Sequence, residues 1–168
     1  SAGNSSNDAT TDELVVDTLA PQLPLVVSQI TNNTEPVLEG SATLGAGENL
    51  SVTVDGQTYA AGAGDLVANP DNSWVLTIPL ANAVSDGVYQ VVAMVTDAAG
   101  NIGTDVSVNE LTVDTVVPAV PVVDSLLTNV VSPVLTGSAV LGANEVLSVA
   151  VNGVTYTEAG GELTVNGD

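Results

Sequence analysis

Apolar and polar residues alternate along most of the chain with a period of two, and no stretch shows the periodicity of a capped helix. Leu50, Val52 and Val54 alternate with Ser51 and Thr53, and the run ends at an Asp-Gly pair. Such alternation puts one set of side chains on each face of a β-strand, and Asp-Gly favours a hairpin turn. The pattern predicts an all-β chain with strands near residues 25–26 and at 37–44, 49–54, 57–61, 65–67, 73–79, 87–96 and 104–113.

The inward positions of these strands predict the core. Trp74 and Tyr59 are expected inside it or at its edge, rather than on a surface that stacks sugars. Strand acids such as Glu39 and Asp105 are expected to face solvent, and a bulge is expected near Asn109. The last strand is expected to bury Val106, Val108, Leu111 and Val113.

The whole pattern recurs after 97 residues without a gap, and about half of the 71 comparable positions are identical. A fixed period of this kind indicates tandem structural repeats. About seven short strands per repeat, separated by Gly- and Asn-containing turns, are typical of an Ig-like Greek-key β-sandwich. We therefore predict three parts: residues 1–16 as the last strand of a preceding repeat, residues 17–113 as a complete repeat, and residues 114–168 as the truncated N-terminal part of the next.

Composition excludes most kinds of chemistry. The chain has 20 Asp and Glu residues and no Lys, Arg, His or Cys. Disulfides, thiolate or imidazole metal sites and catalysis by His, Lys or Cys are therefore excluded, as is binding of nucleic acid by charge. No apolar run reaches the ~18 residues that span a bilayer, so no membrane insertion is expected. An enzyme is not expected, because the surviving option, a glycosidase with two carboxylates, needs a cleft that a small sandwich lacks.

The order of motifs adds a resemblance that covers nearly the whole chain. It runs from Val-Asp-Thr-x-x-Pro-x-x-Pro (16–24) through Pro-x-Leu-x-Gly-x-Ala (36–42), Ser-Trp-x-Leu-x-Ile-Pro (73–79) and Asp-Gly-x-Tyr-x-Val (86–91) to Thr-Asp-Ala-Ala-Gly-Asn (96–101). This resembles the bacterial Ig-like tandem repeats of giant type I-secreted adhesins, of the RTX type and the biofilm-associated type. The resemblance implies a stalk at the bacterial cell surface, outside the cell, that supports adhesion or biofilm formation and is stiffened by Ca²⁺ at domain junctions.

The expected partners are then neighbouring Ig-like repeats and calcium ions, and self-association into a fibre stays an open alternative. A second alternative is a glycan- or surface-binding Ig-like module. That function needs exposed aromatic residues, and the chain has one Trp and three Tyr.

Calcium takes about 6–8 oxygen ligands, which this acidic chain can supply. Asp17 and Asp114 lie where one repeat passes into the next, and the loops of each repeat are expected to bring further oxygens to those joints. Asp86 is expected to approach the joint at Asp114, although it also suits an ordinary hairpin turn. Each candidate has a plainer interpretation as a turn former or a solvated acid. The candidate calcium ligands are Asp17, Glu48, Asp71, Asp97, Asn101, Asp114 and Glu145.

Overall fold

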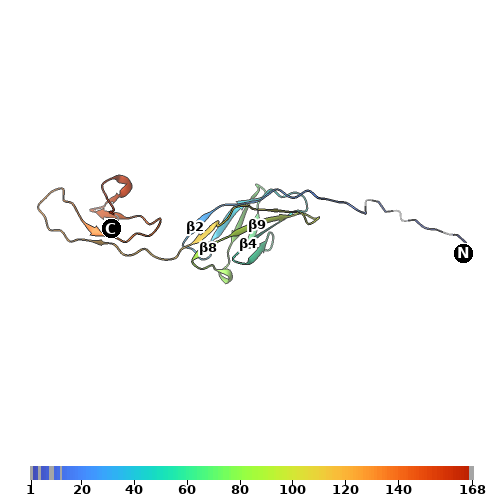
Figure 1. The fold of residues 1–168 in the computed structure, drawn as a ribbon, viewed down its shortest axis with the longest axis horizontal. Coiled ribbons are helices and arrows are strands. Elements are labelled where there is room, and N and C mark those ends of the chain that lie inside the picture. Colours follow the sequence, from blue (N-terminus) through green and yellow to red (C-terminus); the bar gives the residue numbers. More distant parts are fainter. Residues whose placement is uncertain (1, 4, 8–9, 12, 167–168) are drawn as a thin grey trace. The chain divides into compact units, whose positions relative to one another are not determined.

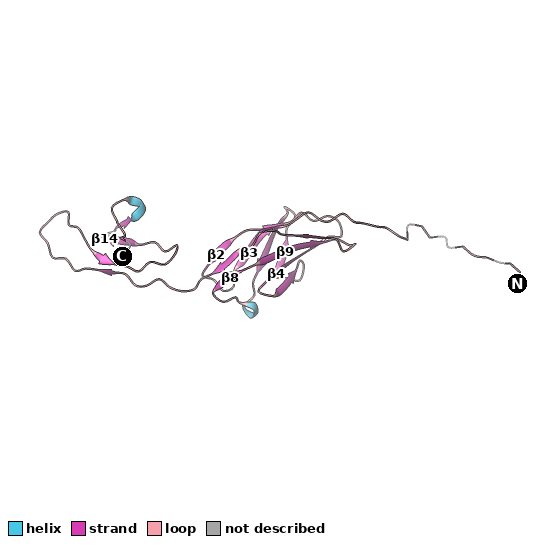
Figure 2. Ribbon diagram, in the orientation of Figure 1, coloured by secondary structure: helices cyan, strands magenta, loops and turns pink. Residues whose placement is uncertain are grey.

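The computed structural model describes residues 2–3, 5–7, 10–11 and 13–166, and it confirms an all-β chain (Figures 1 and 2). Two compact units are present, Ser1–Thr115 (unit 1) and Val116–Asp168 (unit 2), and each is described by itself. Two short 3₁₀ turns, η1 (Leu80–Asn82) and η2 (Glu158–Gly160), interrupt the strands. Among the described residues, no helix has the length and apolar character needed to cross a membrane.

Unit 1 is a sandwich of two layers (Figure 1). The first layer has the order β1 (Leu25–Val26), β3 (Val37–Ser41), β7 (Ser73–Thr77), β6 (Leu66–Ala68). The second layer contains two sheets, β10 (Ile102–Thr104), β9 (Val91–Thr96), β4 (Asn49–Val54), β5 (Gln57–Ala60) and β2 (Gln29–Thr31), β11 (Leu111–Val113), β8 (Gly87–Tyr89). Only the β2–β11 pair is parallel among these pairs of unit 1. The chain thus passes from the first layer at β1 to the second layer at β2, and this arrangement is that of an Ig-like sandwich.

The core confirms most inward positions of the sequence pattern. Trp74 on β7 and Tyr59 on β5 are buried, as expected. Gly40 on β3 lies opposite Trp74, and a Cβ at this position would overlap both the indole ring and the carbonyl oxygen of Leu25. A glycine inside a strand is otherwise unfavourable, so its place here follows from the close approach of the ring.

The last strand differs from the prediction. Residues 104–113 were expected to form one strand, but only β10 and β11 at its two ends are paired. Val106 and Val108, expected in the core, are 78% and 70% exposed, whereas Asp105, expected to face solvent, is buried. The prediction was wrong because the inward face keeps a single phase, with Gly103, Asp105, Leu111 and Val113 buried. Val106 and Val108 fall on the opposite phase, and the ladder ends after Asp105, whose amide still donates to the Ala93 carbonyl at 2.9 Å.

Between β10 and β11, hydrogen bonds from side chains to the backbone take the place of strand-to-strand hydrogen bonds. Gln90 separates β8 from β9. Its side-chain Nε2 donates to the Ser107 carbonyl at 2.9 Å, and its Oε1 accepts from the backbone amide of Asn109 at 3.2 Å. Glu110 is 1% exposed, and its Oε2 accepts from the Val91 amide at 2.8 Å. Its Oε1 is buried without a hydrogen-bond partner. The Glu110 carboxylate thus satisfies a backbone donor that the broken ladder leaves unpaired.

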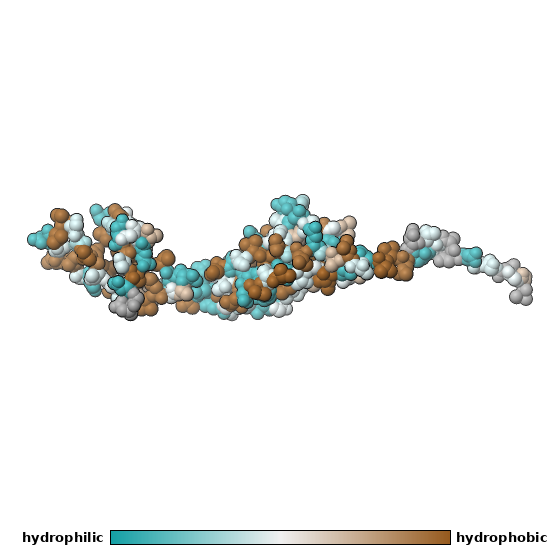
Figure 3. Space-filling view, turned by 45° about the horizontal axis from the view of Figure 1, so that its top comes forward, coloured by the Kyte–Doolittle hydropathy of each residue, from teal (hydrophilic) through white to brown (hydrophobic). Residues whose placement is uncertain are grey.

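Unit 2 repeats the first half of this sandwich. Its described residues 116–166 correspond to residues 19–69 of unit 1. β12 (Val122–Val123) pairs with β13 (Gly137–Ser138) in the register of β1 and β3, and β14 (Ser148–Val151) pairs with β15 (Val154–Thr157) in that of β4 and β5. Leu135 is 40% exposed, against 1% for its counterpart Leu38, and Figure 3 shows apolar atoms at the surface of this unit.

The segment before Asp17 also has a counterpart. Leu14 and Val16 are exposed, while Leu111 and Val113, which lie 97 positions later, are buried in β11. Residues 1, 4, 8–9 and 12 lie outside the described part of the chain. The assignment of residues 1–16 to a preceding repeat stays a prediction, as do the repeat boundaries at 17–113 and 114–168.

The role of Glu110 can be tested by two substitutions. Glu110→Ala leaves the buried Val91 amide unpaired and is expected to lower the free energy of unfolding by about 1–3 kcal/mol. Glu110→Gln keeps an acceptor for the Val91 amide, so it should stay closer to wild type. Urea unfolding followed by the fluorescence of Trp74, the single Trp of the chain, measures both. The control is Glu39→Ala at an exposed strand position, expected to change stability by less than about 0.5 kcal/mol. Equal stability of the Ala and Gln variants would contradict this role.

Candidate functional site

The loop between β9 and β10 is organised by one carboxylate. Oδ1 of Asp97 accepts from the amides of Ala99 at 2.9 Å and Asn101 at 2.8 Å. Its Oδ2 accepts from the side-chain amide of Asn101 at 2.8 Å. Gly100 takes the left-handed conformation, with φ 92°, that lets the loop turn back within this span. Asp97 and Asn101, two of the predicted ligands, are therefore in direct contact.

The same loop reaches a third predicted residue. The Nδ2 group of Asn101 also donates to the carbonyl oxygen of Asp17 at 3.1 Å. Oδ1 of Asp17 accepts from the Leu19 amide at 3.0 Å, which fixes the turn that follows. Since both neighbours of Nδ2 are acceptors, the network sets the orientation of the Asn101 amide, with nitrogen toward Asp97 and Asp17.

Hydrogen bonding shifts the acidity of this loop. The Asn101 side-chain amide, with smaller contributions from nearby backbone amides, lowers the pKa of Asp97 from its ordinary value. The cause is that donors directed at a carboxylate stabilise its charged form. Asp97 is therefore anionic at neutral pH.

The other predicted ligands of unit 1's loops make local bonds. Glu48 accepts from the Gly45 amide at 2.8 Å, and its counterpart Glu145 in unit 2 accepts from Gly142 at 2.7 Å. Asp71 accepts from the amide and hydroxyl of Ser73 at 3.0 and 2.6 Å, and the hydroxyl bond is the main reason that the pKa of Asp71 is lowered. These bonds agree with the plainer interpretation of the three acids as loop formers.

The last residue of unit 1, Thr115, is hydrogen-bonded to Asp86, which lies in the loop between η1 and β8. Its Oδ1 accepts from the Thr115 amide at 3.0 Å and from the Thr115 hydroxyl at 2.7 Å. The neighbouring predicted ligand, Asp114, donates its own amide to the Thr31 carbonyl at 2.9 Å. Asp86 therefore contacts the residue after Asp114, and its approach to a calcium ion at this joint stays a prediction. The sequence analysis did not single out Thr115.

Within the described ranges, no group of three or more Asp or Glu side chains is placed so as to hold a metal ion. Asp17, Asp97 and Asn101 come together, and their donor set is rich in oxygen, as calcium requires. A cation between Asp97 and the Asp17 carbonyl would require the Asn101 amide to turn its oxygen inward. The calcium ligands therefore stay a prediction.

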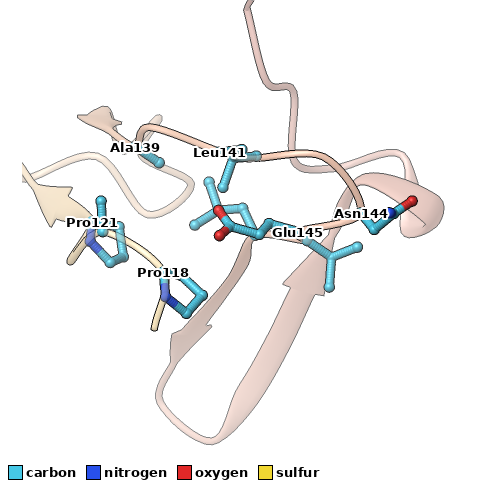
Figure 4. Close-up of a pocket in the computed structure, with 9 residues that line it drawn as sticks. Pro118, Pro121, Ala139, Leu141, Asn144 and Glu145 are labelled. Carbon is cyan, nitrogen blue, oxygen red and sulfur yellow. The ribbon is translucent and has the colours of Figure 1, made fainter. Parts of the chain in front are cut away.

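Unit 2 contains a pocket of about 330 Å³, shown in Figure 4. Most of its lining is apolar, and Glu145 is among the lining residues. Two of these residues, Ala139 and Leu147, are counterparts of Ala42 and Leu50, which are buried in the core of unit 1. The pocket therefore corresponds to core space and not to a ligand site of the repeat.

Comparison with known proteins identifies the family. Residues 26–115 match the family described as "Bacterial Ig-like domain". The chain belongs to this family. The Ig-like architecture of unit 1 agrees with the match, and Ig-like modules of this kind are typically structural rather than enzymatic. No match was found among curated proteins.

Solved structures of Ig domains are similar to this bacterial Ig-like chain. One is the titin M10–obscurin-like 1 Ig complex, at 21% identity over 55% of this chain and 88% of that chain, with a TM-score of 0.31. Another is the titin I-band fragment I67–I69, at 15% identity over 82% of this chain and 54% of that chain, with a TM-score of 0.35.

The shifted pKa of Asp97 gives a testable consequence. Because the folded pKa lies below the unfolded one, this carboxylate stabilises the loop above its ordinary pKa of about 3.9, and the contribution is lost as the pH falls through the lowered value. A ¹³C titration of the Asp97 carboxyl should give a midpoint below that of the same group in urea. Asn101→Ala should move the midpoint upward. A midpoint unaffected by Asn101→Ala would contradict the assigned cause.

Proposed function

We propose that this chain is a stalk segment of a large bacterial cell-surface adhesin, located outside the cell, in which calcium at the junctions between Ig-like repeats adds rigidity. In this role the repeats carry an adhesive part away from the cell and support adhesion or biofilm formation. The observation that carries the proposal is the tandem recurrence, at 97 residues, of a sandwich joined through a short Pro-containing segment.

The joint itself favours stiffness. Pro21 and Pro24, which follow Asp17, are buried against unit 1, and proline fixes φ of the backbone. Each sandwich adds the length of its strands, which rise ~3.3 Å per residue, together with its loops. Length in such a protein therefore grows with the number of repeats, provided that the joints do not fold back.

The aromatic residues do not favour a glycan-binding module. Trp74 and Tyr59 are buried, and the Tyr59 hydroxyl accepts from the Asn82 side chain at 2.9 Å. Tyr89 donates its hydroxyl to the Ser85 carbonyl at 2.9 Å, the arrangement known as a tyrosine corner. These rings support the sandwich, and a stacking surface for sugars would need them exposed.

Calcium is the natural cation for this chain, because a net charge of −20 has no side-chain cation to offset it. The residues that would hold it at the first joint are Asp17 and Asp97, with Asn101 after its amide has turned. When bound, calcium would supply positive charge between carboxylates that otherwise repel. Extracellular modules bind calcium at about 10⁻⁴–10⁻³ M, so such a joint would be occupied outside the cell.

A calcium titration of the full chain by NMR tests this proposal. The amides of Leu19, Ala99 and Gly100 should shift in a saturable way, with a dissociation constant of about 10⁻⁴–10⁻³ M. Asp17→Asn keeps the acceptor for Leu19 but removes the charge, and it should weaken binding about tenfold.

The matched control is Asp55→Asn, which removes the same charge in a turn whose counterpart is Asn152. It should leave calcium binding unchanged. Small-angle scattering with calcium and with chelator then compares particle length. Amides that do not respond to calcium up to about 10 mM, ten times the weakest expected constant, would rule out the calcium part of the proposal.

A further inference from the structure

Unit 1 holds the short segment that follows its last strand, β11. Thr115 donates both its amide and its hydroxyl to one oxygen of Asp86, at 3.0 and 2.7 Å. Hydrogen bonds to a carboxylate are stronger than bonds between neutral groups. The loop that carries Asp86 is itself fixed, because the adjacent Ser85 carbonyl accepts from the Tyr89 hydroxyl.

Unit 1 also holds the residues that precede its first strand. Asn101 donates to the Asp17 carbonyl at 3.1 Å. The backbone of Pro21 and Gln22 then lies against β10, so close that a Cβ on Gly103 would approach their carbonyl oxygens to 2.6 and 2.9 Å. The chain is therefore anchored to unit 1 from Asp17 onward.

The repeat relates the two anchored positions, the Asp17 carbonyl and Thr115, to one and the same dipeptide. Asp17-Thr18 and Asp114-Thr115 are equivalent pairs, 97 residues apart. We propose that the Asp-Thr pair of each joint is held from both sides without metal, its Thr by the Asp86-type carboxylate of the preceding sandwich and its Asp carbonyl by the Asn101-type amide of the following one. This inference rests on the proposed function only in that successive sandwiches are joined through this pair.

The two anchors cross. The sandwich that comes first in the chain holds the second residue of the pair, and the sandwich that comes later holds the first. No residue is then left between the two anchors to act as a hinge. Such a joint resists bending through hydrogen bonds alone, and calcium would add to a rigidity that already exists.

The first test examines each anchor in the full chain, in the presence of EGTA. Asp86→Ala should speed hydrogen exchange of the Thr115 amide about tenfold or more and lower its order parameter from about 0.85 to below about 0.6. Asn101→Ala should likewise lower the order parameter of the Thr18 amide, which belongs to the same peptide group as the Asp17 carbonyl. Asp86→Asn keeps an acceptor and should preserve most of the order at Thr115, while Asp55→Asn should have no effect. Unfolding followed by Trp74 fluorescence shows that unit 1 stays folded in each variant.

The second test examines a whole joint. A second copy of residues 17–113 is inserted after Val113 of the full chain, which recreates the Val-Asp-Thr sequence between two complete sandwiches. Because the chain has no Cys, exposed Thr77 can be replaced by Cys in both copies as the only labelling sites. Pulsed electron paramagnetic resonance then measures the distribution of distances between the two spin labels.

A narrow distribution in EGTA, broadened by Asp86→Ala in the first copy together with Asn101→Ala in the second, is the expected result. A distribution that is broad in EGTA, or narrow only with calcium, would overturn the metal-free joint and leave the calcium proposal standing in the second case. A narrow distribution in EGTA that the two substitutions leave narrow would also overturn it. A distribution that calcium does not change, but the substitutions broaden, would support the joint and count against calcium rigidification.

Discussion

Carboxylates in this chain have no side-chain cation to pair with, so N–H and O–H groups are the donors that can stabilise their charge. Backbone amides take this part for exposed acids as well as for the buried Glu110, although Oε1 of Glu110 is left without a partner. The carboxylates that accept from amides are those of Asp17, Glu48, Asp71, Asp86, Asp97, Glu110 and Glu145. Acids that suggest metal binding in the sequence therefore organise the loops of a bacterial Ig-like sandwich and the segments beside its first and last strands.

This use of acids bears directly on function. An array of sandwiches acts as a spacer only if force or thermal motion does not bend it at the joints. In unit 1 polar side chains at both ends hold the chain that enters and leaves the sandwich, the Asn101 amide at one end and the Asp86 carboxylate at the other. A net charge of −20 gives two copies a mutual electrostatic repulsion, which salt or calcium would reduce.

Much of the fold could be predicted from the sequence, because alternation and turn residues act locally. The strand at residues 49–54 was predicted at its observed bounds, and the burial of Trp74 followed from its phase within a strand. The break between β10 and β11 could not be predicted in the same way, since alternation carried through Val106 and Val108 supports the wrong face. The signal that was missed is the Glu that recurs at positions 13 and 110. Glu110 stands next to Leu111, which is buried, so an acid at this position suggests a role inside the sandwich.

The candidate site was predictable in part for a similar reason. Turn chemistry places Asp97 and Asn101 in one loop, and the Ig-like topology brings that loop to Asp17. What the sequence could not specify is which atoms face one another. The orientation of the Asn101 amide and the two hydrogen bonds from Thr115 to Asp86 depend on tertiary geometry. They decide whether an acid accepts from an N–H group or remains free for a cation.

The most direct test of this account is detection of scalar couplings across the hydrogen bonds themselves, in EGTA, by long-range NMR correlation of amide nitrogen with carbonyl or carboxyl carbon. The account predicts cross-peaks from the Thr115 amide to the Asp86 carboxyl carbon and from the Asn101 side-chain nitrogen to the Asp17 carbonyl carbon. If both are absent while cross-peaks of the β4–β9 ladder are visible, these hydrogen bonds do not hold the two ends of the sandwich, and the account is contradicted.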